Sequence, residues 1–131
     1  MFRKGVTMPK AVIVDDSKAI RMILSKTLEE VGFEVCQASN GEEALSVFER
    51  EKGTISLALV DWNMPLMNGL EFVKRLRSDP RYASVRLMMV TTETEVEQMV
   101  QAMEAGANEY VMKPFTKEII ADKLRLLGAL Q

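Results

Sequence analysis

Polar residues with the chemistry of a cation or phosphoryl site directly follow apolar runs in this sequence. They are Asp15, Asp16, Asp61, Thr91 and Lys113. Three carboxylates brought together from neighbouring strands would repel one another unless protons or a cation neutralised them. An oxygen-only ligand set with room for water suits Mg²⁺, with Mn²⁺ as a substitute, better than Zn²⁺, which usually takes nitrogen or sulfur. The residue types therefore predict a divalent metal site.

A carboxylate at such a site can also attack phosphorus and form an acyl phosphate, because the metal ion offsets the charge on the phosphoryl oxygens. The chain has no histidine, so Asp61 is the expected phosphoryl acceptor. Lys113 would bring a positive charge to the phosphoryl group, and the Thr91 hydroxyl would give it one hydrogen bond. Each residue alone has a purely structural interpretation, as a helix-starting acid, a solvated lysine or a strand threonine. The prediction depends on their joint placement.

Alternating apolar runs and helical spacing explain how residues so far apart in the chain meet. The expected strands cover 11–14, 33–38, 57–60, 87–90 and 110–112. Ser17 can cap the first helix, whose apolar stripe is expected to include Ile23, and Gly32 can end it. Four further helices follow the later strands, and the last is expected to turn Ile119 inwards.

This alternation predicts an α/β fold, with a doubly wound parallel sheet of five strands, right-handed crossovers and helices on both faces. Ligands of such open sheets bind outside the carboxyl ends of the strands, at the point where the strand order reverses. The polar residues described above stand at these strand ends. The predicted site and the predicted fold therefore agree.

Composition limits the class of protein. With 131 residues, of which 47% are hydrophobic, the chain suits one domain over 1–131, with a flexible tail expected over 1–8. A net charge of −2 argues against a nucleic-acid partner. The single Cys36 cannot form an intramolecular disulfide, and no apolar run is long enough to span a membrane, so we expect a cytoplasmic protein without membrane insertion.

The motifs, in this order and at these spacings, resemble the CheY-like receiver domain of two-component response regulators. They are Val14-Asp15-Asp16-Ser17, Val60-Asp61-Trp62-Asn63-Met64-Pro65 with Gly69, Thr91-Thr92, and Lys113-Pro114-Phe115. The resemblance extends roughly from Pro9 to Leu127. It implies a flavodoxin-like (βα)5 fold with strand order 2-1-3-4-5. It also implies a cis peptide bond before Pro114.

The resemblance implies specific roles at the predicted site. Asp61 would accept a phosphoryl group from the phosphohistidine of a histidine kinase, and Lys113 and Thr91 would contact that group. Asp16, Asp61 and the backbone carbonyl of Asn63 would bind Mg²⁺ directly, and Asp15 would help through water. By family analogy, Asn63 and Glu93 would tune the rate of phosphoryl loss. Thr92 stands where many receivers have a smaller residue, often alanine, and would slightly crowd access to the phosphoryl group.

The same resemblance predicts a switch. Thr91 would move towards the phosphoryl oxygens and Tyr110 would turn inwards, changing the face formed by the fourth helix, the fifth strand and the fifth helix. Tyr110 could also be an edge-strand aromatic that only packs. Met99 and Met103 either fill the core or belong to an adaptable partner surface on that face.

The leading hypothesis is a monomeric, chemotaxis-type single-domain regulator that catalyses only its own phosphorylation and dephosphorylation. Its expected partners are a histidine kinase, a downstream protein for which the flagellar motor switch is a candidate, and a phosphatase. A phosphoryl sink or phosphorelay intermediate is an alternative with the same chemistry. A haloacid-dehalogenase-like phosphatase would need an acid where Asn63 stands, and a flavin phosphate would be repelled by Asp15 and Asp16.

Overall fold

The computed structural model describes residues 8–93 and 95–129. Of the tail predicted over 1–8, only Met8 lies within the described residues, and its side chain is exposed. No helix in the described ranges is long and apolar enough to cross a bilayer.

A five-stranded parallel sheet forms the centre of the molecule. Its strands are β1 (Lys10–Val14), β2 (Glu34–Ala38), β3 (Ile55–Val60), β4 (Arg86–Thr91) and β5 (Glu109–Met112). They lie in the order β2-β1-β3-β4-β5, so the predicted order 2-1-3-4-5 is confirmed. The run Ala11 to Val14 is fully buried and β3 and β4 are nearly so, which explains why their sequences are continuously apolar.

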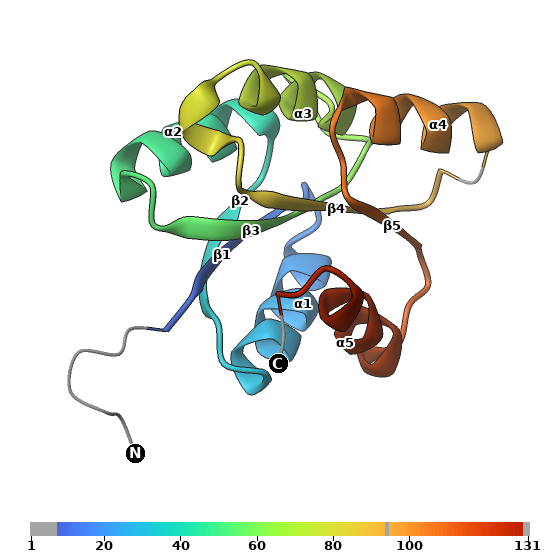
Figure 1. Ribbon diagram of the computed structural model, residues 1–131. Coiled ribbons are helices and arrows are strands. Elements are labelled where there is room, and N and C mark those ends of the chain that lie inside the picture. Colours follow the sequence, from blue (N-terminus) through green and yellow to red (C-terminus); the bar gives the residue numbers. More distant parts are fainter. Residues whose placement is uncertain (1–7, 94, 130–131) are drawn as a thin grey trace.

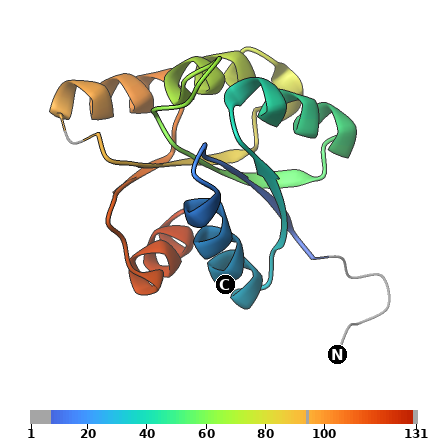
Figure 2. The same ribbon diagram turned by 180° about the vertical axis from the view of Figure 1, so that it is seen from behind.

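Helices cover both faces of the sheet, as Figures 1 and 2 show. They are α1 (Lys18–Glu30), α2 (Gly41–Glu51), α3 (Gly69–Arg77), α4 (Val96–Ala105) and α5 (Lys117–Leu126), with a 3-10 turn, η1 (Pro80–Tyr82), after α3. α1 and α5 lie on one face, and α2, α3 and α4 on the other. The sheet therefore separates two apolar clusters, one built around Leu24, Leu28 and Ile120 and the other around Phe48 and Phe72.

Side-chain caps fix where most helices begin. Ser17 accepts a hydrogen bond from the backbone N–H of Ile20, as the sequence predicted, and Asn68 forms a reciprocal capping box with Glu71. The Lys113–Pro114 peptide bond is cis, which confirms the expectation from the resemblance. These caps start α1 and α3 directly after the loops that carry the aspartates.

Two residues predicted to face the core are exposed instead. Ile23 on α1 is 52% exposed and Ile119 on α5 is 43% exposed. Each lies next to the true inner face, which Leu24, Leu28 and Ile120 occupy, because one residue along a helix turns the side chain by about 100°. The spacing predicted the helices correctly but made their buried stripes too wide.

Arg77, near the end of α3, ties three segments together through its half-buried guanidinium group. Its Nε donates to the carbonyl oxygen of Gly106 at 3.0 Å, and its Nη1 donates to that of Tyr82 at 3.0 Å. Its Nη2 donates to Asn108 Oδ1 at 2.9 Å, and the same amide oxygen accepts from the backbone N–H of Leu87. Arg77 thereby joins η1 to the loop between α4 and β5.

We predict that Arg77→Met lowers the free energy of unfolding by about 2–4 kcal/mol, because it leaves several part-buried acceptors without a donor. Arg75→Met is the matched control: Arg75 lies on the same helix but its side chain is exposed, so its loss should change stability by less than about 0.5 kcal/mol. Urea denaturation of both variants measures the difference. Equal effects would contradict the role assigned to Arg77.

Candidate metal and phosphoryl-transfer site

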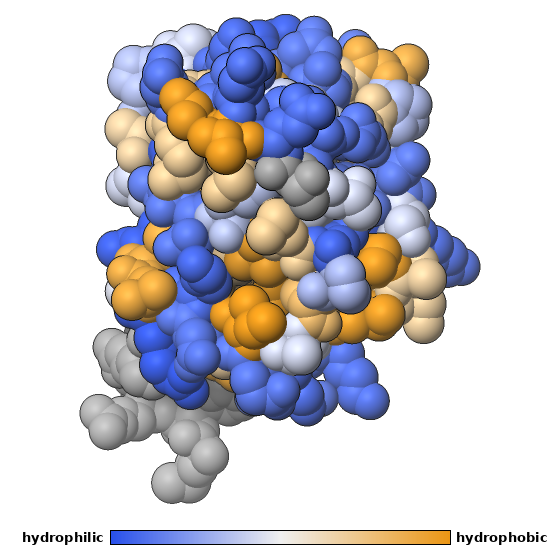
Figure 3. Space-filling view, turned by 90° about the vertical axis from the view of Figure 1, so that its right-hand side faces the viewer, coloured by the Kyte–Doolittle hydropathy of each residue, from blue (hydrophilic) through white to orange (hydrophobic). Residues whose placement is uncertain are grey.

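The structure brings the predicted site residues together at the carboxyl edge of the sheet. Asp15 directly follows β1, Asp61 follows β3, Thr91 ends β4 and Lys113 follows β5. The backbone N–H of Asp61 donates to the carbonyl of Val14 at 2.9 Å, which holds the acceptor loop against the end of β1. In Figure 1, β4 and β5 end on the right-hand side, which is the side that Figure 3 faces.

Asp15, Asp16 and Asp61 form an acidic cluster. One carboxylate oxygen from each lies within 4.8 Å of the other two. Asp15 and Asp61 are 1% and 7% exposed, whereas Asp16 is exposed to solvent. A donor set of oxygens alone, open to water on one side, fits a hard divalent cation such as Mg²⁺.

Lys113 supplies positive charge to this cluster. Its Nζ lies 2.8 Å from Asp15 Oδ2 and 3.5 Å from Asp61 Oδ2. Burial raises the pKa of Asp61; Lys113 opposes this shift and the neighbouring Asp15 reinforces it. Ionisation of Asp61 is therefore less favourable in the folded protein than in an aspartate surrounded by water.

The loop after β3 holds Asp61 in place. The Asp61 Oδ1 atom accepts a hydrogen bond from the backbone N–H of Trp62 at 2.8 Å, and the backbone N–H of Gly69 donates to the Trp62 carbonyl at 2.8 Å. A Cβ atom at Gly69 would lie 2.1 Å from the Asp61 carbonyl oxygen, so only glycine fits there. The glycine quoted in the sequence motif thus allows the loop to fold back on its own aspartate.

Comparison with known proteins identifies the family. A family model described as the response regulator receiver domain matches residues 11–125. The chain belongs to this family.

Several receiver proteins resemble this one along most of their length. "Chemotaxis protein CheY1" of Helicobacter pylori is 40% identical over 119 residues, which cover 90% of this chain and 95% of that protein. The solved structure of chemotaxis protein CheY4 of Vibrio cholerae has a TM-score of 0.85 and 36% identity, and the match covers 92% of this chain and 99% of that one. A structure titled "BeF3 Activated DrrB Receiver Domain" has a TM-score of 0.78 and 26% identity, over 92% and 97% of the two chains. The chain is a receiver domain of the CheY type, from two-component chemotaxis signalling.

Glu93 forms hydrogen bonds with three other predicted site or switch residues of this receiver domain, Asn63, Thr91 and Tyr110. Asn63 Nδ2 donates to Glu93 Oε1 at 2.6 Å, and the Glu93 backbone N–H donates to Thr91 Oγ1 at 3.3 Å. The Tyr110 hydroxyl donates to the Glu93 carbonyl at 2.8 Å. Tyr110 is 8% exposed, so its side chain both packs inwards and joins this network. The family resemblance assigned Glu93 a rate-tuning role but did not predict that it joins these segments.

The open side of the acidic cluster leads into a shallow hollow. Its lining residues are Asp16, Asn63, Met64, Pro65 and Asn68. Met64, Pro65 and Asn68 had no predicted role at the site. Only Asn68 had a recognisable sequence pattern, because Glu71 follows it three residues later. The two residues form a capping box that fixes the end of this loop at the start of α3.

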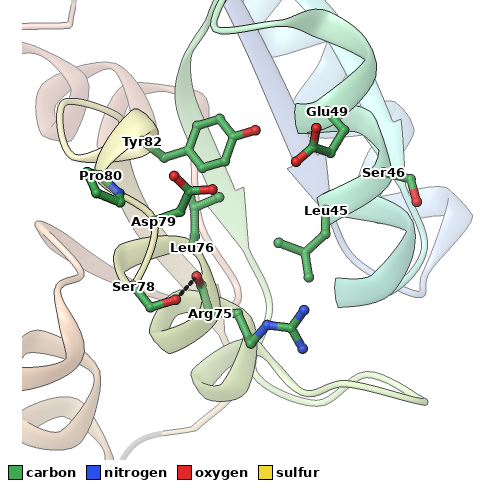
Figure 4. Close-up of a pocket in the computed structure, with 9 residues that line it drawn as sticks. All are labelled: Leu45, Ser46, Glu49, Arg75, Leu76, Ser78, Asp79, Pro80 and Tyr82. Atoms are coloured by element: carbon green, nitrogen blue, oxygen red, sulfur yellow. Dashed lines mark hydrogen bonds between the residues drawn. The ribbon is translucent and has the colours of Figure 1, made fainter.

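A larger hollow lies between α2 and α3 and is shown in Figure 4. Leu45 and Glu49 line it from α2, and Tyr82 lies opposite. Two of its carboxylates are already paired, because Arg81 Nη2 lies 2.6 Å from Glu49 and 2.7 Å from Asp79. None of the acidic-cluster residues lines this hollow, so it is separate from the candidate site.

Exposed hydrophobic side chains occur on the predicted partner face. Those on α4, β5 and α5 are Val96, Val100, Met103, Met112, Ile119 and Leu126. Figure 3 shows hydrophobic patches separated by hydrophilic side chains on this side of the molecule. Met103 is 44% exposed and Met99 is half-buried against the core, so α4 provides both a packing methionine and an exposed one.

We predict that Asp61→Asn stabilises the metal-free protein at neutral pH. The folded state raises the pKa of Asp61, so the folded protein binds the proton of this carboxyl group more tightly than the unfolded chain does. Above the folded pKa, the ionised carboxylate therefore lowers the free energy of unfolding of the wild-type protein. The gain should therefore be complete at neutral pH and disappear as the pH falls below the ordinary aspartate value of 3.8.

Urea denaturation in EDTA, from about pH 3 to about pH 8, measures this dependence. Asp16→Asn is the matched control, since Asp16 is exposed and its charge needs no desolvation. An Asp61→Asn variant less stable than wild type at neutral pH would mean that the Lys113 contact outweighs burial.

Proposed function

We propose that this receiver domain is a phosphorylation-activated response regulator. Asp61 takes a phosphoryl group from the phosphohistidine of a histidine kinase and thereby changes the affinity of the domain for a protein target in chemotaxis. The observation that carries the proposal is the buried Asp61 carboxylate, close to Asp15, Asp16 and the Lys113 ammonium. Family membership and similarity to chemotaxis proteins support the pathway.

The acidic cluster is the proposed metal site. Asp16, Asp61 and the Asn63 carbonyl would bind Mg²⁺ directly, with Asp15 acting through water, and the ion would offset charge on the phosphoryl oxygens. Mn²⁺ has similar ligand preferences and would substitute. All of these groups donate oxygen, which supports this choice of metal.

The transfer makes one bond and breaks one. An Asp61 carboxylate oxygen attacks phosphorus, the bond between phosphorus and the donor's histidine nitrogen breaks, and the electron pair of that bond stays with the nitrogen. Lys113 Nζ, now 3.5 Å from Asp61 Oδ2, is close enough to pair with the new phosphoryl charge. The buried Thr91 hydroxyl accepts from the Glu93 backbone N–H and lies within hydrogen-bonding reach of the Asp61 carboxylate, so it would donate its proton to a phosphoryl oxygen carried by Asp61.

Loss of the phosphoryl group returns the domain to its first state. Water attacks phosphorus, the bond between phosphorus and the Asp61 oxygen breaks, and inorganic phosphate leaves while the carboxylate is regenerated. We propose that the domain catalyses no reaction other than its own phosphorylation and dephosphorylation. Asn63 and Glu93 are the proposed rate-tuning residues, and their hydrogen bond of 2.6 Å at the open side of the site supports that role. A separate phosphatase is a further expected partner.

The face of α4, β5 and α5 is the proposed target surface. Its exposed hydrophobic side chains, including Val100 and Met103, suit a protein partner, and the flagellar motor switch is a candidate for it. Tyr110 links this face to the site through Glu93. We further propose that the domain acts as a cytoplasmic monomer and does not bind nucleic acid.

Trp62 gives a direct test, because it is the only tryptophan and its backbone N–H contacts the Asp61 carboxylate. We predict that its fluorescence changes on addition of millimolar Mg²⁺, roughly the affinity range of weak carboxylate sites, and changes again on addition of acetyl phosphate or beryllofluoride. Mass spectrometry should find one added phosphoryl group after the acetyl phosphate reaction.

Asp61→Asn is the control and should lose the second fluorescence change and the added mass, because an amide is not a nucleophile towards phosphorus. EDTA should abolish labelling of the wild-type protein. A folded wild-type protein that takes up no phosphoryl group at saturating Mg²⁺ would refute the proposed function.

A further inference from the structure

Arg21 on α1 joins three segments beside the acidic cluster. Its Nη1 donates to the backbone carbonyl of Asp15 at 2.6 Å, and its Nε donates to Gln37 Oε1 on β2 at 3.1 Å. The guanidinium group thereby connects α1 to the turn after β1 and to the neighbouring strand β2. Arg21 had no predicted role at the site.

The local structure directs Arg21 to this turn. Arg21 lies one helical turn after the cap residue Ser17, and its backbone N–H donates to the Ser17 carbonyl at 3.0 Å. Side chains of a helix lean towards its N-terminus, so the guanidinium group reaches back to the Asp15 carbonyl. Gln37 comes to the same place because β2 pairs with β1, where Gln37 lies opposite Ile13. Helix direction and strand pairing together therefore place both partners of Arg21.

The Asp16 carboxylate depends on this turn for its position. It is exposed, and among the hydrogen bonds of the described residues none holds it. The Asp15 carboxylate, in contrast, accepts from the Ser17 backbone N–H at 2.9 Å and from Lys113 Nζ at 2.8 Å. The carbonyl that Arg21 binds belongs to the peptide unit between Asp15 and Asp16. The Arg21 contact therefore fixes the direction in which the chain continues to Asp16.

We propose that Arg21 is a positioning residue for the divalent metal, and that it holds the Asp15–Asp16 peptide unit so that the Asp16 carboxylate faces the acidic cluster. The inference rests on the proposed metal site and adds a residue outside the ligand set. A hydrogen bond from a charged donor is stronger than one between neutral groups. Loss of a group that orients a metal ligand without touching the metal typically lowers metal affinity by about 10- to 100-fold.

The sign of the effect separates positioning from plain electrostatics. Arg21 is a cation beside an anionic site, so its charge alone opposes the binding of a second cation. If Arg21 contributed only charge, removing it would tighten Mg²⁺ binding. Positioning predicts the opposite, because an Asp16 carboxylate that no longer faces the cluster binds the ion less well.

The test measures the Kd of Mg²⁺ through Trp62 fluorescence in Arg21→Met, Arg21→Lys and Lys18→Met. Methionine keeps an unbranched side chain without a donor, whereas lysine keeps the charge but lacks the guanidinium fork that reaches two acceptors. Lys18 is the matched control, because it is an exposed cation in the first turn of the same helix. Urea denaturation in EDTA checks that each variant is folded, and Arg21→Lys carries the test if Arg21→Met does not fold.

We expect the Kd of Mg²⁺ to rise about ten-fold in Arg21→Met and about three-fold in Arg21→Lys, and to change by less than about two-fold in Lys18→Met. At saturating Mg²⁺, the rate of labelling by acetyl phosphate should stay within about two-fold of the wild-type rate in all three variants, because the Asp16 carboxylate is then held by the ion it binds. Arg21 would thus act on metal affinity and not on the transfer itself.

A Kd equal to or below the wild-type value in a folded Arg21→Met or Arg21→Lys variant would overturn the positioning role. An equal rise in Lys18→Met, or slower labelling of the Arg21 variants at saturating Mg²⁺, would overturn it as well. If the wild-type protein itself gives no response to Mg²⁺, the proposed metal site fails, and this inference with it.

Discussion

Two buried carboxylates compete for one ammonium group at the edge of this sheet, and the chemistry of the site depends on that imbalance. Lys113 lies closer to Asp15 than to Asp61, at 2.8 Å and 3.5 Å, so Asp61 keeps a negative charge that is only partly compensated. Burial makes such a charge unfavourable and raises the pKa of Asp61. A cation entering beside the exposed Asp16 would correct the imbalance. Under the proposed function, metal binding and the reactivity of Asp61 therefore have a common electrostatic cause.

The fold produces this arrangement through close backbone approaches rather than through the carboxylates themselves. β1 and β3 are neighbours in the centre of the sheet, and the hydrogen bond from Asp61 N–H to the Val14 carbonyl continues their pairing beyond the strands. Gly69 then lets the loop return so closely that no side chain fits against the Asp61 carbonyl. Because buried apolar strands and a closed loop hold the acidic residues, their mutual repulsion does not spread them apart.

The sequence predicted those parts of the molecule that follow from periodicity and from where apolar runs stop. Continuous apolar runs indicated central parallel strands, and the residues that end them, such as Asp15 and Asp61, meet because parallel strands end at one edge. The outward orientation of Ile23 was not predictable, because periodicity gives the direction of a helix face but not how much of it a neighbour covers. The contacts of Glu93 and the hydrogen bond from Arg21 to the Asp15 carbonyl depend on loop conformations, which side-chain patterns do not determine.

Under the proposed function, the Glu93 contacts explain how a change at Asp61 reaches a distant face without breaking the network. A threonine hydroxyl can donate and accept at once, so Thr91 can bond a phosphoryl oxygen and still accept from the Glu93 backbone. Movement of Thr91 then carries the Glu93 backbone with it. The carbonyl that holds the Tyr110 hydroxyl and the side chain that pairs with Asn63 belong to the same residue, so both must move as well. Since packed elements shift between discrete arrangements, a small displacement at the site is enough to change the face of α4 and β5.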